Sequence, residues 1–169
     1  MRKLLVILLA LCTLLVSVSF SGCGKEDTSN EIVDGYLTYV LQEDGTYSVR
    51  ATDPNDVPET VVIPETFNGV SVTALEDGAF GGSTVLRKIT LPPTITRIPA
   101  GAFYRCQTLV RVEIQGTLTG IGNGAMGLCH QHITIYYSGT RAEWDDILKA
   151  GNWATETEYS VICSDSSIS

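Results

Sequence analysis

Apolar residues recur along the middle of the chain with a fixed period of 23 residues. Aligning on Ala79-Phe80 brings Ala102-Phe103 and Ala125-Met126 into register, and a glycine precedes each pair. The other apolar positions that coincide are Leu75, Ile98 and Ile121; Ile89, Val112 and Ile135; and Leu91, Ile114 and Tyr137. A fixed period of this length is typical of solenoids, in which each copy buries its apolar side chains against the next copy. The pattern therefore predicts three repeats over residues 72–139.

Each repeat contains a short segment in which apolar residues alternate with polar ones. This alternation, as in Ile89-Thr90-Leu91, is the pattern of a strand with one buried face. Pro92-Pro93 ends the first such strand, because proline cannot donate to a strand ladder. The chain then runs back along the opposite side of the same coil through residues 95–98. The Gly-Ala-Phe segment makes a tight corner. The predicted fold is a short, mainly β solenoid of parallel strands joined by tight corners.

The segments on either side of the repeats are predicted to cap the solenoid. In the N-terminal cap and partial repeat, residues 32–71, strands at 36–41 and 46–49 flank a turn at 42–45 and form a hairpin. Residues 61–64 match the strand-proline half of a repeat. Residues 140–169 are expected to be a C-terminal cap and tail, in which Thr140 and Glu143 form a capping box that opens a short helix. In this helix Trp144, Ile147 and Leu148 recur at helical spacing, and Trp144 is expected to cover the last coil.

The three copies VTALEDGAFGGSTVLRKITLPPT, ITRIPAGAFYRCQTLVRVEIQGT and LTGIGNGAMGLCHQHITIYYSGT resemble the BspA-type leucine-rich repeat of bacterial surface proteins. The resemblance covers about residues 60 to 148, and a "YY-x-GT-x-x-EW" segment similarly closes the array in related proteins. The third copy departs from the pattern at Met126 and His132, as terminal repeats commonly do. The resemblance implies adhesion, because members of the family are associated with attachment to host matrix proteins and to other cells.

The N-terminus has the features of a secretory signal. Arg2 and Lys3 precede an apolar run, Leu4 to Phe20, which ends in Ser21-Gly22 before Cys23. The segment from Phe20 to Cys23 resembles the lipobox of bacterial lipoproteins, although that family prefers leucine where this chain has Phe20. The resemblance implies a signal peptide over residues 1–22 and a diacylated Cys23. An ordinary secretory signal and an uncleaved membrane anchor are the alternatives.

Two acyl chains on Cys23 would hold the protein on the extracytoplasmic face of the cell membrane, since one chain gives only marginal binding. Residues 23–31 are then the lipidated cysteine and a polar tether, which is expected to be disordered because it has no apolar side chain to bury. Residues 24–31 reach at most about 30 Å when extended. The folded domain is therefore expected close to the membrane.

The charge of the chain argues against a nucleic-acid partner. The net charge of −8 becomes −10 when Arg2 and Lys3 are removed with the first 22 of the 169 residues. The remaining 147 residues suit one domain and contain no basic cluster. Phosphate binding requires stripes of lysine and arginine, so neither nucleic acid nor an anionic lipid surface is an expected partner.

The sequence offers little to support an enzyme. It has no nucleophile elbow, phosphate-binding loop or dinucleotide fingerprint. Cys129, His130 and His132 form the one cluster of metal-competent side chains, but a zinc site there would lack a fourth ligand. Cys129 takes the repeat position of Ser83 and Cys106, and His132 takes a core position occupied by leucine in the earlier copies. No catalytic residue, metal or cofactor is predicted.

Two of the repeat cysteines are expected to lie in adjacent coils. Cys106 and Cys129 could stand about 5 Å apart, which permits a disulfide in an oxidising compartment. A ladder of reduced, buried thiols is the favoured alternative. A disulfide between Cys106 and Cys129 would not include Cys163.

The strand face provides a candidate ligand-binding surface. Between the buried positions, the side chains that project outward are Lys88, Thr90, Arg111, Glu113, Thr134 and Tyr136. Stacked coils would align them into a patch with Tyr136 as its aromatic anchor, although polar residues on this face are equally what any solvated strand needs. Three strands present only about 250 Å², against about 800 Å² per partner in a standard interface.

Two functions follow from this scaffold. The first is a lipid-anchored ligand-binding or adhesion module at the cell surface, with a protein or glycan ligand. The second is a structural or assembly component of the cell envelope, docking to a neighbouring membrane or wall protein through a cap or an edge of the solenoid.

Overall fold

The computed structural model describes residues 30–165, which form short strands and one short helix. In chain order the elements are β1 (Glu31–Asp34), β2 (Leu37–Leu41), β3 (Tyr47–Ala51), β4 (Thr60–Val62), β5 (Thr66–Phe67), β6 (Val70–Leu75), β7 (Lys88–Leu91), β8 (Arg97–Ile98), β9 (Arg111–Ile114), β10 (Gly120–Ile121), β11 (Ile133–Tyr137), α1 (Arg141–Asp146), β12 (Leu148–Lys149) and β13 (Tyr159–Cys163). The fold is mainly β, as predicted.

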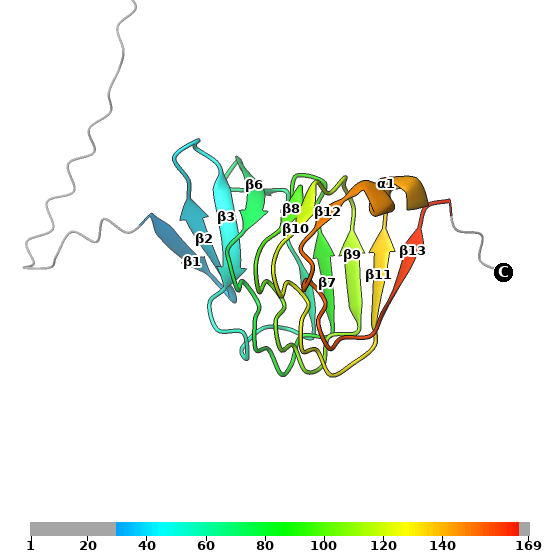
Figure 1. Ribbon diagram of the computed structural model, residues 1–169. Helices are drawn as coiled ribbons and strands as arrows, with labels where there is room; N and C mark the ends of the chain where they lie inside the picture. The colour runs from blue at the N-terminus through cyan, green and yellow to red at the C-terminus, as the bar shows by residue number, and fades with distance from the viewer. Residues whose placement is uncertain (1–29, 166–169) are drawn as a thin grey trace, which may run out of the picture.

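The strands stack as a short solenoid of about four turns (Figure 1). One side is a five-stranded parallel sheet in the order β13-β11-β9-β7-β4, and the other is a three-stranded parallel sheet in the order β12-β10-β8. Ile89 pairs with Val112, and Val112 with Ile135, so each coil advances one strand per 23-residue repeat. The predicted solenoid of parallel strands is confirmed.

The corner of each repeat is built from a glycine, an alanine and a large apolar side chain. Gly78 and Gly101 have φ angles of 68° and 63°, a left-handed conformation that glycine adopts without a steric penalty. The amide of Phe80 donates to the carbonyl of Ala102 in the next coil at 2.8 Å. Phe80 and Phe103 are both fully buried. The corner thus fills the solenoid interior while its backbone links neighbouring coils.

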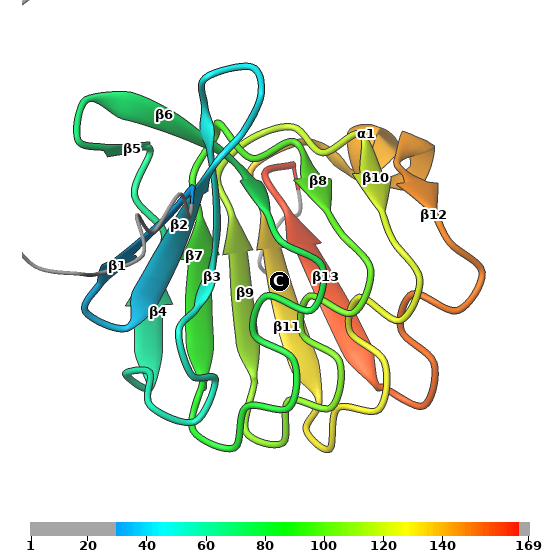
Figure 2. The same ribbon diagram turned by 90° about the vertical axis from the view of Figure 1, so that its left-hand side faces the viewer.

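The N-terminal cap is a sheet in the order β1-β2-β3-β6-β5. Strands β2 and β3 form the predicted antiparallel hairpin, and β3 joins the solenoid by pairing in parallel with β6. Figure 2 shows this sheet at the N-terminal end of the stacked coils. The predicted polar tether extended to Glu31, but Glu31 is instead the first residue of β1, because its strand pairs with β2.

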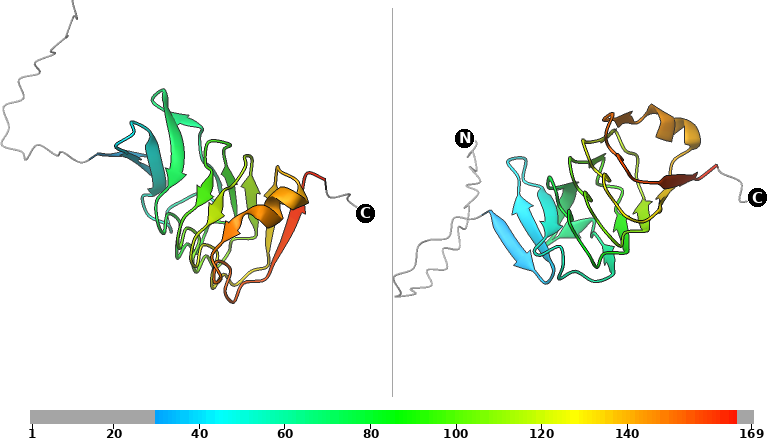
Figure 3. Two further views of the ribbon diagram at one scale, coloured as in Figure 1. Left: turned by 45° about the horizontal axis from the view of Figure 1, so that its top comes forward. Right: turned by 60° about the horizontal axis from the view of Figure 1, so that its bottom comes forward.

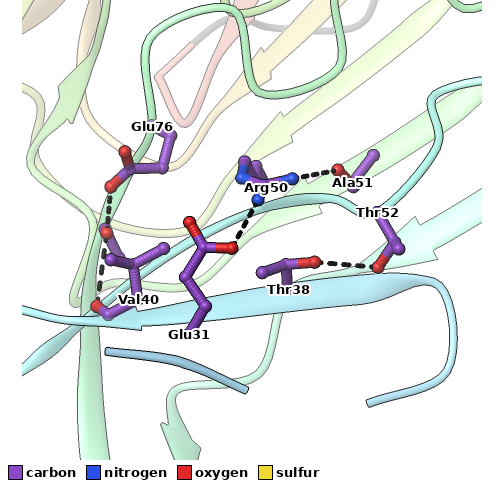
Figure 4. Close-up of polar contacts among 8 residues, drawn as sticks. Glu31, Thr38, Val40, Arg50, Ala51, Thr52 and Glu76 are labelled. Atoms are coloured by element: carbon purple, nitrogen blue, oxygen red, sulfur yellow. Dashed lines mark hydrogen bonds and ion pairs between the residues drawn. The ribbon is translucent and has the colours of Figure 1, made fainter. Parts of the chain in front are cut away.

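Polar contacts tie the strands of the cap together (Figure 4). Thr38 and Thr52 share a hydrogen bond of 2.9 Å between their hydroxyl groups, and Arg50 forms an ion pair of 2.8 Å with Glu31. The Ser48 hydroxyl donates to the carboxylate of Glu76. Glu76 therefore anchors the hairpin to the first coil of the solenoid.

The predicted C-terminal helix is present as α1, with the capping box formed by Thr140 and Glu143. The helix is shorter than expected: Ile147 caps it in an extended conformation, and Leu148 lies in β12 with 79% of its surface exposed, so the helical spacing predicted for these two residues is wrong. Trp144 is buried and contacts Tyr137 of the third repeat, with ring centroids 5.5 Å apart. This contact agrees with the expectation that Trp144 covers that repeat. Trp144 also packs against Trp153, with ring centroids 6.2 Å apart, so Trp144 lies inside a further coil.

That further coil was not expected from the sequence. Strand β12 pairs in parallel with β10 and β13 pairs in parallel with β11, at the end of the molecule where α1 lies (Figure 3). The amide of Met126 donates to the carbonyl of Trp153, as Phe103 donates to Ala125. Trp153 thus takes the alanine position, 28 residues after Ala125 in place of 23. The helix occupies the extra residues, which is why the repeat period did not reveal this coil.

Candidate ligand-binding face

The five-stranded sheet brings together all six residues that the alternation placed on its outer face. Lys88, Arg111 and Thr134 form one row across β7, β9 and β11. Thr90, Glu113 and Tyr136 form the next row. The residues between these rows, Ile89, Val112 and Ile135, are fully buried, so the rows project away from the core.

Glu113 is the centre of a polar network on this face. Its Oε1 atom lies 3.0 Å from Nζ of Lys88 and 2.6 Å from Nη2 of Arg111, and it also accepts a hydrogen bond from Nε of Arg111. Its Oε2 atom accepts from the hydroxyl of Thr90 at 2.9 Å. Thr90 is only 5% exposed, so it supports Glu113 from below and is not itself accessible to a ligand.

The environment of Glu113 favours its ionised form. Burial raises the pKa of the Glu113 carboxyl, but hydrogen bonds from Lys88, Thr90 and Arg111 lower it by more, and the net pKa lies below the ordinary value. Glu113 therefore remains a carboxylate at neutral pH, with both oxygens occupied by its neighbours.

Arg111 connects this network to an aromatic residue. Its guanidinium carbon lies 3.9 Å from the centroid of the Tyr136 ring, a cation–π contact between adjacent strands. The Arg111 side chain is 41% exposed, and within residues 30–165 its Nη1 atom has no hydrogen-bond partner. The pair therefore offers solvent a fixed cation on an aromatic support.

The face extends beyond the three predicted strands on both sides. Thr60 and Val62 of β4 continue the two rows at one edge, and Ser160 and Ile162 of β13 continue them at the other. Five strands raise the flat area from about 250 to about 400 Å². The alternation of Ser160-Val161-Ile162 was a signal for β13, but no repeat period linked it to the other strands.

A shallow groove of about 370 Å³ lies where β9, β11 and β13 end. Its lining includes Arg111, Tyr136 and Ile162. Three exposed polar side chains lie one row further along the strands: Gln115, Ser138 and Ser164. These three residues were not singled out from the sequence, because they follow the ends of their strands.

The histidines near Cys129 do not form a metal centre in the described part of the chain. His130 and His132 are exposed, whereas Cys129 is buried. His132 hydrogen-bonds to Ser160 and lies 3.8 Å from Glu158. Residues 30–165 contain no group of three histidine, cysteine or acidic side chains that could hold a metal ion.

The expected core position of His132 is wrong. Ile133, the next residue, is fully buried, whereas His132 keeps its imidazole at the surface against β13. An imidazole in this apolar interior would lose its hydration, and the neighbouring isoleucine fills the space without that cost.

Cys106 and Cys129 are both free thiols, so the structure contains the reduced ladder and not a disulfide. Each Sγ atom donates to a main-chain carbonyl of the preceding coil, Cys106 to Phe80 and Cys129 to Phe103, both at 3.2 Å. Burial raises the pKa of Cys106 to about 12. These thiols are packing groups and not nucleophiles.

The predicted signal peptide (1–22), Cys23 and most of the tether lie outside the described residues. Within residues 30–165, no helix is long and apolar enough to cross a membrane.

The stacked coils, corner glycines and five-stranded outer face together define a leucine-rich-repeat solenoid. Residues 59–145 match the family model described as "BspA type Leucine rich repeat region (6 copies)". This match covers half of the chain, and the chain belongs to that family. No curated protein matches the sequence.

Two solved structures are similar to this chain. A leucine rich cell surface protein from Faecalibacterium prausnitzii A2-165 is 26% identical over 66% of this chain, with a TM-score of 0.53. The match spans only 30% of the length of that protein. A leucine-rich repeat protein from Bacteroides capillosus is 19% identical over 80% of this chain and 99% of its own, with a TM-score of 0.59, and shows the fold.

Proposed function

We propose that this protein is a cell-surface binding module that holds a protein or glycan ligand on its five-stranded face and catalyses no reaction. The observation that carries the proposal is the fixed arrangement of Arg111, which is held by Glu113 on one side and by the ring of Tyr136 on the other. Side chains already fixed before binding lose little conformational freedom on binding. Arginine and tyrosine are also among the residues that most often dominate binding energy at interfaces.

Membership of the BspA-type family supports this function, and so does the similar cell surface protein from Faecalibacterium prausnitzii. The face of about 400 Å² is still half of a standard interface. Binding by one copy should therefore be weak. Many copies held together on one membrane would strengthen attachment through multivalency.

We further propose that Cys23 is diacylated and holds the protein on the extracytoplasmic face of the cell membrane. The charged Arg2-Lys3 pair, the apolar run and the Ser21-Gly22-Cys23 sequence support this anchor. Cells fed an alkyne analogue of palmitate should label the wild-type protein but not a Cys23→Ala variant. Label on the Cys23→Ala variant would contradict the anchor.

Exposure at the cell surface is tested by treating intact cells with a protease too large to enter the wall. Loss of residues 24–169 would support a ligand outside the cell. Protection until the wall is stripped would restrict the ligand to the envelope and exclude adhesion to host surfaces.

The binding face is tested by capturing ligands from matrix-protein and glycan arrays with the purified protein. An Arg111→Ala/Tyr136→Ala variant should lose binding by at least tenfold. The matched control is Tyr104→Ala/Arg105→Ala, which removes a second arginine–tyrosine contact, with 5.4 Å between guanidinium carbon and ring centroid, at a solenoid corner. Equal binding by both double variants would place the ligand on another surface.

A structural role in the envelope is the second candidate function, and the C-terminal end of the solenoid favours it. Strands β12 and β13 are the outer strands of their sheets, and Leu148 is 79% exposed. Co-purification of one endogenous envelope protein in a fixed ratio, lost in a Leu148→Glu variant, would support this role. Retention of that partner by Leu148→Glu would exclude docking at this end.

A further inference from the structure

We propose that the groove at the ends of β9, β11 and β13 binds an acidic sugar residue, whose carboxylate pairs with Arg111 while its hydroxyl groups contact Gln115, Ser138 and Ser164. The inference rests on the proposed function, because the groove is part of the same face. It assigns a ligand class to the face and adds Gln115, Ser138 and Ser164, which neither the repeat pattern nor the family match singles out.

The size of the groove suits a small ligand group. Its volume of about 370 Å³ lies at the lower end of the range for ligand pockets, about 300 to 1,000 Å³. One sugar ring fits this volume, whereas the folded surface of a protein would need a much larger contact.

The charge of the face favours an anion. The charged side chains in the two rows are Lys88, Arg111 and Glu113, which give the rows a net charge of +1 on a protein whose net charge is −8. Of these three residues, Arg111 and Glu113 line the groove. Glu113 carries one negative charge and pairs with both Lys88 and Arg111, so one positive charge remains on the face. A carboxylate can form a charge-assisted hydrogen bond with Arg111, whose side chain is 41% exposed and lines the groove.

The polar row matches hydroxyl groups. Register places Gln115, Ser138 and Ser164 side by side, since Tyr137 pairs with both Ile114 and Cys163 one residue earlier. Their amide and hydroxyl groups can both donate and accept hydrogen bonds, as sugar hydroxyls do. Tyr136 and Ile162 supply the apolar side of the groove, against which the ring carbons of a sugar can pack.

The position of the groove disfavours an extended acidic peptide. An extended peptide that adds a strand to a sheet is held by main-chain hydrogen bonds along a free edge. Here the main chains of β9 and β11 are paired on both sides, so a ligand on this face meets side chains only. The outer strands of this sheet are β4 and β13, so a peptide added as a strand would lie beyond one of them and not over β9 and β11.

The test is calorimetric titration of the full-length protein in detergent with glucuronate, galacturonate and N-acetylneuraminate. Glucose and galactose are the neutral counterparts, and a glutamate-rich hexapeptide is the competing anion. At least one acidic sugar should bind, at least tenfold more tightly than a neutral sugar. Arg111→Gln should weaken that binding at least tenfold, while the control Arg97→Gln, an exposed arginine on the opposite sheet, should leave it unchanged.

A Ser138→Val variant, which removes one hydroxyl group from the polar row and leaves Arg111 in place, should also weaken sugar binding and provides a second test should Arg111→Gln unfold. Equal binding of acidic and neutral sugars, tighter binding of the peptide, or no binding of any sugar would overturn the inference. If the array ligand still requires Arg111 and Tyr136 while every sugar fails, the proposed function stands and the acidic-sugar assignment alone is wrong.

Discussion

The ring of Phe103 stacks on the ring of Phe80, one repeat earlier, with centroids 6.1 Å apart and planes 21° from parallel. Both side chains are fully buried, and each belongs to a corner whose backbone forms hydrogen bonds with the next coil. Contact between neighbouring coils is what stabilises a solenoid, because no single coil can cover its own apolar side chains.

Replacing Phe103 with alanine should therefore lower the free energy of unfolding by about 3–5 kcal/mol, through lost burial and the cavity left between coils. Tyr104, the next residue, is 38% exposed, and Tyr104→Ala should cost clearly less. Urea unfolding followed by circular dichroism measures both changes. Similar losses for the two variants would mean that the corner aromatics do not determine stability.

Gly122 provides a test of how closely the coils approach each other. A Cβ atom added there would lie 2.6 Å from the amide nitrogen of Ala100 and 2.8 Å from the carbonyl carbon of Pro99. Gly122→Ala should destabilise the protein by about 1–3 kcal/mol, since backbone atoms must move. Gly151→Ala, where a Cβ atom meets nothing within 4 Å, is the matched control and should be neutral or slightly stabilising. Thermal melts of the two variants should separate them.

The raised pKa of the Cys106 thiol predicts that the protein loses stability at high pH. Its native pKa of about 12 exceeds the ordinary value of 9.0, so folding favours the neutral thiol. The resulting stabilisation is complete below pH 9 and is lost as the pH rises towards 12. A Cys106→Ser variant lacks this contribution, so its difference in unfolding free energy from the wild type should shrink across that range. A constant difference would show that the thiol titrates normally in the folded protein.

Glu113 predicts the opposite dependence at low pH. Its native pKa lies below the ordinary value of 4.5, so the folded state favours the carboxylate. The stabilisation is present above pH 4.5 and is lost as the pH falls through the native pKa. Glu113→Gln should cost about 1–2 kcal/mol at neutral pH, because Lys88 and Arg111 lose their charged partner at a partly exposed site. Urea unfolding at neutral pH and at pH 2 should show this difference vanish in acid, and its persistence would exclude the ionised network as its cause.

The 23-residue period was enough to predict the stacked parallel coils, because the same side chains recur wherever one coil must cover the next. Alternation at Lys88-Ile89-Thr90 likewise predicted which residues lie on the outer face, since successive side chains of a strand point to opposite sides. The hairpin of β2 and β3 and the capping box at Thr140 are local patterns, and both are present.

Tertiary contacts decided the rest. The coil that contains Trp153 breaks the period, and only pairing of β13 with β11 brings Ile162 beside Tyr136. Ile133 is buried and His132 is exposed, because burying an imidazole in an apolar interior costs free energy. The contacts of Arg111 with Glu113 and Tyr136 depend on side-chain positions across strands. A sequence repeat specifies which residues stack, whereas such contacts and the groove beside them depend on how the stacked strands pack.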